Sequence, residues 1–336
     1  MVHLNNIWML KKYIFGLLNA IGISSLLRLQ KKNTLTVLSL HRISDDRDYF
    51  WNPITPATFE KLLQYVAKYY SIISFSDVPH LRKDPSSKPY LILSFDDGYS
   101  DFYDHALPLL KKYNLPCNHN IVNNCATNNQ IIWTQRLNHI FNYCRDRNIN
   151  LSFDFKDNKI AFESFNNNWM NFYLDIFKSL LETAKIEREY ILEEKEKEYS
   201  INPFCKMMNW EQILECSENL VEIGCHTYSH DLLSTIDDVE ILRKEILKST
   251  QEIESRINKK INILALPNGQ GNEQIKQIIS ESGLKYILSV EDKVNNIAEL
   301  GNCSTYNIFR INMLEESHAE MILRIELLHS KIRKYV

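Results

Sequence analysis

Apolar runs rich in β-forming residues alternate with stretches of helical periodicity along most of this chain. Residues 35–40, 90–95 and 261–266 have the composition of strands that are buried on both faces. Strands that alternate with helices favour a parallel sheet, either open or closed into a barrel. In a barrel the carboxyl ends of the strands share one face, so side chains that follow the strands converge there. The polar residues that directly follow predicted strands are His41, Asp96, Asp97, His226 and Asn268.

A central segment departs from this alternation. With 336 residues the chain can form one large domain or two smaller ones. Residues 151–155 alternate like an exposed strand, and residues 169–200 have helical periodicity and end in a dense charge run that is typical of a solvated helix face. We interpret residues 131–203 as a helical insertion, and residues 34–336 as one barrel that contains it.

The first 33 residues predict an amphipathic helix, because apolar residues recur there at helical spacing. The apolar stretch within residues 13–27 is interrupted by polar residues and is shorter than the ~20 residues that span a bilayer. One interpretation is a helix packed on the domain. The other is peripheral contact with a membrane, with Trp8 and Phe15 among the headgroups and Lys11 and Lys12 outside them.

Composition excludes some classes of function. The formal net charge of -3 gives no indication of general nucleic-acid binding. The 7 cysteines are odd in number, irregularly spaced and without a C-x-x-C pair, so we expect neither a thiolate metal site nor a disulfide framework. Buried thiols in a reducing compartment are the simplest interpretation.

Two adjacent carboxylates, Asp96 and Asp97, follow the predicted strand 90–95. Successive side chains of a strand point to opposite faces. If this alternation persists into the turn, one carboxylate is available as a metal ligand and the other as a base. Gly98 suits a sharp turn at this point. The alternative is an ordinary strand-to-helix turn with an aspartate as its N-cap.

Two histidines four residues apart, His226 and His230, follow the predicted strand 221–225. On a helical turn this spacing places both imidazoles on one face, and Thr227 and Ser229 are candidates to hydrogen-bond their second nitrogens. Two imidazoles and one carboxylate form a ligand set for a small divalent metal, and the second carboxylate is left as a base. These are the groups that hydrolysis by a metal-activated water requires. A purely structural role for the histidines is the alternative.

These strings resemble motifs of the polysaccharide deacetylase family, the NodB homology domain of carbohydrate esterase family 4. Residues 94–98 (SFDDG) are similar to its first motif, residues 226–230 (HTYSH) to its second, and residues 264–269 (LALPNG) to its weaker third motif. The resemblance extends over residues 34–310, except the insertion. It implies a distorted (β/α) barrel, a divalent metal that is usually zinc, and removal of an N- or O-acetyl group from a sugar.

The resemblance also implies roles for single residues. Asp97, His226 and His230 would hold the metal, and Asp96 would be the general base. A backbone N–H near Asn268 would help to hold the oxyanion. The residues that we assign to substrate or oxyanion contacts are Pro267, Asn268, Gly269, Arg42 and Arg310.

The chain departs from the family in its third and fourth motifs. Ala265 stands where the third motif has an arginine, and residues 286–290 lack the aspartate that pairs with it in the fourth. The two losses are consistent, because a buried arginine without its partner would be an unpaired charge. Arg42 and Arg310 are the candidates to replace the missing arginine beside Asp96.

The general acid of the family is a histidine of a fifth motif. Residues 327–329 (LLH) fit this motif only superficially, because they fall in a predicted terminal helix with no strand before them. His41 follows the strand 35–40 and is the better candidate, since this strand comes first in permuted members of the family. A buried structural histidine is the alternative.

The sequence thus predicts a zinc-dependent deacetylase that acts on an acetylated glycan or glycan precursor. A catalytically weak barrel that binds a saccharide is one alternative, suggested by the missing arginine and aspartate. A metal amidohydrolase for a non-sugar amide is another. The cysteines favour a cytoplasmic protein, with or without membrane association, that acts on lipid-linked or nucleotide-linked sugars. If the N-terminus is a signal anchor, the substrate is instead an exported polysaccharide.

Overall fold

Seven parallel strands close into a barrel, and their order around the barrel is their order along the chain. The computed structural model describes residues 13–82, 88–155, 158–165, 168–269, 272–300 and 305–329. Within these residues, the first strand pairs with the second on one side and with the last on the other, which closes the sheet. This confirms the predicted (β/α) barrel. The strands are β1 (Thr34–Leu40), β3 (Tyr90–Phe95), β4 (Cys117–Ile121), β7 (Val221–Cys225), β8 (Ile263–Ala265), β9 (Tyr286–Val290) and β11 (Tyr306–Asn312). Two short strands flank them, β2 (Ser71–Ile72) and β10 (Asn295–Asn296).

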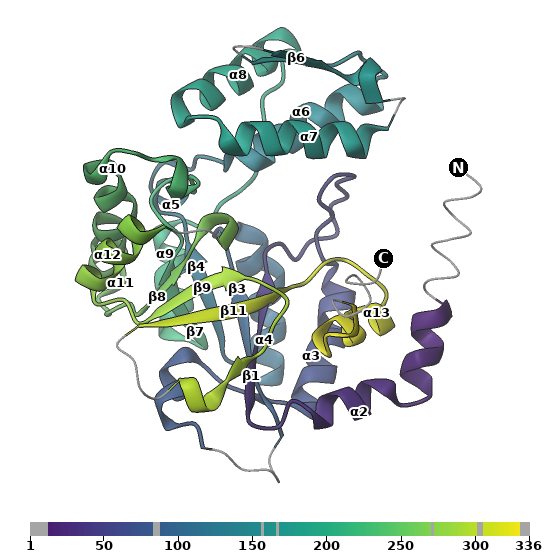
Figure 1. Ribbon diagram of the computed structural model, residues 1–336, viewed down its shortest axis with the longest axis vertical. Helices are drawn as coiled ribbons and strands as arrows, with labels where there is room; N and C mark the ends of the chain where they lie inside the picture. The colour runs from purple at the N-terminus through teal and green to yellow at the C-terminus, as the bar shows by residue number, and fades with distance from the viewer. Residues whose placement is uncertain are drawn as a thin grey trace.

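Helices surround the barrel (Figure 1). The first of them, α3 (Pro56–Tyr69), begins where the sequence provides a cap. The Thr55 side chain accepts a hydrogen bond from the Thr58 N–H, and Pro56 occupies the first turn. Its apolar face, which includes Phe59 and Val66, is buried. The other helices are α4 (Leu107–Tyr113), α5 (Asn123–Asn128), α9 (Trp210–Glu218), α10 (Val239–Arg243), α11 (Ser249–Ile257), α12 (Glu273–Ser282) and α13 (His318–Ile325), after α3 (Pro56–Tyr69).

The barrel strands carry an apolar core and a polar network. Alternate residues of β1, β3, β8, β9 and β11, among them Val37, Ile92 and Ile308, form an apolar cluster. Nearer the carboxyl ends of β3, β4 and β11, buried polar side chains form a hydrogen-bonded network instead. The apolar cluster is therefore the support for a polar site at one end of the barrel.

The segment 131–203 forms a separate layer, at the top of the view in Figure 1. It has a second apolar cluster that is rich in aromatic side chains, including Phe141, Phe153 and Phe172. Residues 169–200 are helical, as predicted, but in two helices, because Thr183 and Ala184 have non-helical backbone between them. The elements are α6 (Trp133–Asp146), the antiparallel pair β5 (Ser152–Phe155) and β6 (Asn158–Ala161), α7 (Trp169–Glu182) and α8 (Lys185–Glu198).

The N-terminal segment is helical over residues 13–20 and again in α2 (Ile23–Leu29), with Gly22 at a φ of 84° between them. Leu17 and Ile21 are more than half exposed, and Phe15 is buried. Within the described part of the chain no helix combines the length and apolar character that crossing a membrane requires. Trp8, Lys11 and Lys12 lie outside the described residues. The predicted membrane contact stays a prediction.

Six of the seven cysteines lie in the described ranges, and these six are buried and not in disulfides. Of the terminal helix predicted over residues 316–335, α13 covers His318–Ile325. Leu327 has a φ of 61°, which interrupts the helix, and residues 328–329 are helical again. Residues 330–335 lie outside the described residues.

Candidate active site

The turn after β3 separates the two aspartates. Asp97 and Gly98 both have left-handed backbone, with φ of 79° and 88°, and the Gly98 N–H donates to the Asp96 carbonyl at 3.1 Å. A left-handed aspartate is uncommon and is tolerated where surrounding contacts hold it. As a result Asp96 contacts side chains of β4 and β11, whereas Asp97 lies against two histidines.

Asp97, His226 and His230 form a buried cluster whose potential ligand atoms all lie within 4.8 Å of one another. Asp97 Oδ1 is 3.3 Å from Nε2 of His226 and 3.4 Å from Nε2 of His230. This oxygen is buried and accepts no hydrogen bond from the described residues. A buried carboxylate oxygen without a donor, facing two imidazole nitrogens, fits a divalent cation such as zinc.

The imidazoles are prepared for this role by their surroundings. Nδ1 of His226 lies 2.9 Å from the carbonyl oxygen of Ala265 and donates to it, which in the neutral ring leaves the lone pair at Nε2, on the side of Asp97. Burial lowers the pKa of His230 to about 4, which leaves its ring neutral at pH 7. Neutral imidazole is the form that binds a metal.

The loop that carries the histidines is not the helical turn that the spacing suggested. Thr227 and His230 have φ of 65° and 60°, and this loop brings the two rings edge to face with centroids 4.7 Å apart. Thr227 Oγ1 accepts a hydrogen bond from the His230 backbone N–H at 3.1 Å. Ser229 Oγ lies 2.7 Å from a carboxylate oxygen of Asp231. Both hydroxyls therefore hold the loop rather than the imidazole nitrogens, contrary to the prediction.

Two carboxylates, the distant Glu245 and the neighbouring Asp231, fix this loop. Glu245 accepts hydrogen bonds from the backbone N–H groups of Tyr228 and Ser229, at 3.0 and 2.9 Å. Asp231, next to the candidate ligand His230, is paired with Arg188 and with Lys185 Nζ, the latter at 2.9 Å. Since Arg188 and Lys185 belong to α8, the inserted layer is anchored directly beside a candidate metal ligand. No sequence pattern marked these partners.

Arg310 and Asn120 hold Asp96. Oδ1 of Asp96 is 2.8 Å from Arg310 Nη1 and 2.7 Å from Asn120 Nδ2, and Arg310 is completely buried. Burial by itself raises the pKa of Asp96, but the Arg310 guanidinium holds this pKa well below its usual range. Asp96 is therefore ionised at neutral pH. The second oxygen, Oδ2, lies 3.9 Å from Nε2 of His41.

The two candidate arginines have different positions. Arg310 of β11 pairs with Asp96, as predicted for one of the two candidates to replace the missing arginine. Arg42 does not: its Nε is 2.7 Å from Asp101 Oδ2, and its guanidinium lies over the ring of Tyr99. Asp101 and Tyr99 draw this side chain away from the aspartate pair, so its assignment to the base is corrected.

Asn120 is the residue that sequence reasoning missed. It lies on β4, and its Nδ2 also approaches Ser94 Oγ at 3.3 Å, while Ser94 Oγ donates to Asn118 at 2.7 Å. A Cβ at Gly224 would lie 2.1 Å from Asn120 Oδ1, so the glycine makes room for this amide. Two asparagines at alternate positions of a buried strand were the available signal.

His41 lies across the site from the histidine pair, with its ring edge-on to Trp51 at a centroid distance of 5.1 Å. Burial lowers its pKa, although the charges of Asp97 and Asp96 oppose this shift. By contrast, the His329 ring stacks on Phe15 of the N-terminal segment. The position of His41 is consistent with the predicted acid, and its role stays a prediction.

The third motif forms a short turn after β8. Asn268 has a φ of 54° and is exposed, and a Cβ at Gly269 would lie 2.7 Å from the backbone nitrogen of Val290. The turn follows closely on Ala265, the residue whose carbonyl accepts from His226. The oxyanion role of Pro267, Asn268 and Gly269 stays a prediction.

Comparison with known proteins agrees with this architecture. The profile of the family described as polysaccharide deacetylase matches residues 83–141 and 147–287. Among curated protein sequences none matches. The fold is similar to that of the deacetylase PplD of Streptococcus pyogenes, solved with acetate (TM-score 0.57, 16% identity, covering 87% of this chain and 98% of that one). It is similar to that of IcaB of Ammonifex degensii (TM-score 0.56, 16% identity, covering 88% of this chain and 97% of that one). It also resembles that of a de-N-acetylase of Aggregatibacter actinomycetemcomitans (TM-score 0.50, 18% identity, covering 90% of this chain and 100% of that one). Since the profile covers more than half of the sequence, this chain belongs to the polysaccharide deacetylase family, whose members are hydrolases of polysaccharide acetyl groups.

Proposed function

We propose that this protein is a metal-dependent hydrolase that removes an acetyl group from a sugar of a polysaccharide or glycan precursor. One observation carries the proposal: adjacent carboxylates have opposite environments. Asp97 has a buried oxygen without a donor between two imidazoles, whereas Asp96 is held ionised by Arg310. One group is suited to bind a cation and the other to accept a proton.

Asp97, His226 and His230 would hold the cation, and we propose zinc because one carboxylate and two imidazoles are typical zinc ligands. When bound, zinc supplies Lewis acidity toward the acetyl carbonyl and lowers the pKa of a water molecule.

The protein's own groups handle the protons. Oδ1 of Asp96 is engaged by Arg310 and Asn120, so Oδ2 is the oxygen left to take the proton of the attacking water. His41, 3.9 Å from Oδ2, would donate a proton to the departing amine or hydroxyl group. The products are acetate and a sugar with a free amine or hydroxyl.

The position of Arg310 also bears on the alternatives. A catalytically weak saccharide-binding barrel was suggested by the missing arginine of the third motif. Arg310 supports the enzymatic proposal, because it supplies a guanidinium to Asp96 from another strand.

The test measures zinc binding and turnover separately. Asp97→Ala or His230→Ala should abolish zinc binding, measured as metal content after dialysis. Asp96→Asn should keep zinc but lose acetate release from an acetylated oligosaccharide. Asp104→Asn is the matched control. Asp104 is an exposed carboxylate a few residues after the aspartate pair, and its variant should behave as wild type. A fully active Asp96→Asn variant, or turnover that survives chelation, would refute the proposal. Activity on a simple aryl amide but not on any sugar would favour the amidohydrolase.

A further inference from the structure

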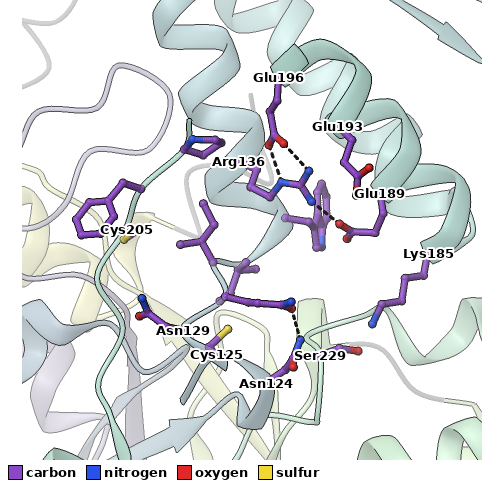
Figure 2. A pocket seen from close by; sticks show the side chains of 16 residues that line it. Asn124, Cys125, Asn129, Arg136, Lys185, Glu189, Glu193, Glu196, Cys205 and Ser229 are labelled. Carbon is purple, nitrogen blue, oxygen red and sulfur yellow. Dashed lines mark hydrogen bonds and ion pairs between the residues drawn. The ribbon is translucent and has the colours of Figure 1, made fainter. Parts of the chain in front are cut away.

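A cavity of about 550 Å³ lies between the inserted layer and the barrel (Figure 2). Its volume is within the range of roughly 300–1,000 Å³ that is usual for small-molecule sites. The walls come from the ends of α5 and α6, from α8, and from the chain around Phe204 and Ser229.

One wall carries more negative than positive charge. Glu189, Glu193 and Glu196 follow one another along α8 and face the cavity with Arg136 (Figure 2). Arg136 binds Glu196 through two nitrogens, at 2.6 and 2.7 Å, and its third nitrogen contacts Glu189. The nearest cation to Glu193 is Lys197, at 4.0 Å, and both side chains are more than half exposed. Arg136 thus compensates only part of the wall.

The other cation of the cavity is already paired. Lys185 lies 2.9 Å from Asp231, which also binds Arg188. Of the three glutamates of this wall, Glu193 is therefore the least compensated, since only the exposed Lys197 pairs with it, at 4.0 Å.

The remaining walls combine an exposed ring with amides. Phe204 is 69% exposed at the edge of the cavity. Asn124 donates to Gln130 at 2.5 Å, and both line the cavity. Trp133 is only 3% exposed, and its Nε1 has no acceptor within the described ranges. An apolar ring face with amide and N–H donors around it matches a sugar, which presents C–H groups on one face and hydroxyls at its edge.

The cavity adjoins the metal-ligand cluster. Ser229 lines it and immediately precedes His230. Cys125 and Cys205 also line it, and the negative charge of Asp97 adds to the effect of burial in raising the pKa of both thiols. A sugar in this cavity would therefore lie beside the one that reacts.

We propose that the cavity is a second sugar subsite, which takes a hexosamine unit with a free ammonium group and pairs it with Glu193. The inference rests on the proposed function, because it places a neighbouring unit of the same glycan there. Such a unit is a product of de-N-acetylation. The enzyme would then prefer chains that have already lost some acetyl groups.

The first experiment measures binding alone. Glucosamine and glucose differ by an ammonium in place of a hydroxyl, and their affinities for the full chain at pH 6 can be compared by ligand-observed NMR titration. One partly exposed ion pair predicts about three- to fivefold tighter binding of glucosamine. Glu193→Gln should remove this preference. Glu194→Gln, a neighbour that does not line the cavity and also contacts Lys197, should retain it. Phe204→Ala should weaken both sugars equally.

Equal affinities in the wild type, or a preference that survives Glu193→Gln, would overturn the inference. A second measurement separates it from the proposed function. Acetate release is compared between the β-1,4-linked N-acetylglucosamine tetramer and the same tetramer after partial deacetylation. Release without any preference for the partly deacetylated chain contradicts the subsite and leaves the deacetylase. A glucosamine preference without acetate release from any acetylated sugar contradicts the deacetylase and leaves the cavity as an amino-sugar site.

Discussion

Removing the Arg310 guanidinium should destabilise this protein through the carboxylate that it leaves behind. Arg310 is completely buried, and its Nη1 lies 2.8 Å from Asp96 Oδ1. In Arg310→Met a linear apolar side chain occupies the same strand position, and Asp96 stays buried without its counter-charge. The loss of one partner of a buried ion pair typically costs about 3–5 kcal/mol. Since Asn120 still donates to Asp96 at 2.7 Å, we expect the lower end, about 3 kcal/mol.

The double variant and the pH dependence identify the cause. Asp96→Asn with Arg310→Met leaves no unpaired charge, so the two changes together should cost about 2 kcal/mol less than their sum. Without Arg310, burial should raise the pKa of Asp96 above its usual 3.8. A raised carboxyl pKa destabilises the folded state above the unfolded pKa and has no effect below it. The deficit of Arg310→Met should therefore be smaller at pH 4 than at pH 7, while the part that comes from the lowered pKa of Asp96 in the wild type remains at pH 4.

Urea denaturation of the four proteins in the presence of a chelator measures these free energies, because metal affinity then does not contribute. Costs that add within about 0.5 kcal/mol would show that the two groups are independent. Such additivity, or a deficit of Arg310→Met that is the same at pH 7 and pH 4, would refute the reasoning.

Three further predictions test other contacts. Gly224→Ala should place a Cβ 2.1 Å from Asn120 Oδ1 and displace the amide that donates to Asp96. A hydrogen bond to a charged group contributes about 1.5–3 kcal/mol, so acetate release should fall at least about tenfold. Wild-type turnover would contradict this prediction. Burial raises the pKa of Glu222 to about 7, so its ionisation costs stability as pH rises from 4.5 through 7. The free energy of unfolding of Glu222→Gln, measured by urea denaturation, should therefore exceed that of the wild type by about 2 kcal/mol at pH 8 and by little at pH 4.5. An equal difference at both pH values would show that the ionisation of Glu222 is not the cause. Arg188→Met should remove the buried cation of Asp231 and leave only Lys185 paired with it, which should lower zinc affinity about tenfold in a chelator competition. Unchanged affinity would show that this link between the layers does not affect the metal.

The strands and the candidate metal ligands were predictable because their signals are local. Residues 35–40 and 90–95 are predominantly apolar runs rich in β-forming residues, which favour buried strands, and Asp96–Asp97 and His226 come at the ends of such segments. The break in the inserted helix at Thr183 was not predictable, since no glycine or proline marks it. Its position depends on how α7 and α8 pack, which is a property of the folded chain.

The contacts of Asp96 were harder to predict. The sequence does not distinguish Arg42 from Arg310 as a partner of Asp96, since each lies at or near the end of an apolar strand. What separates them is the closure of the barrel: β11 lies beside β1, which brings Arg310 inward, and Asp101 binds Arg42. The loop of His226 likewise depends on Glu245, a contact from a helix that follows it. Such long-range pairings leave no periodicity in the sequence.

The order of strands in the closed barrel has a consequence during synthesis. His41 comes from the first barrel strand and Arg310 from the last, and both lie at Asp96. A nascent chain that has released β3 and β7 already carries the candidate metal ligands, but Asp96 has no guanidinium until β11 emerges. The pairing of β1 with β11, which closes the barrel, joins residues far apart in sequence, and such contacts form late. If Asp97, His226 and His230 hold zinc as proposed, they are synthesised before the residue that keeps Asp96 ionised, and a chain without β11 would lack the complete centre.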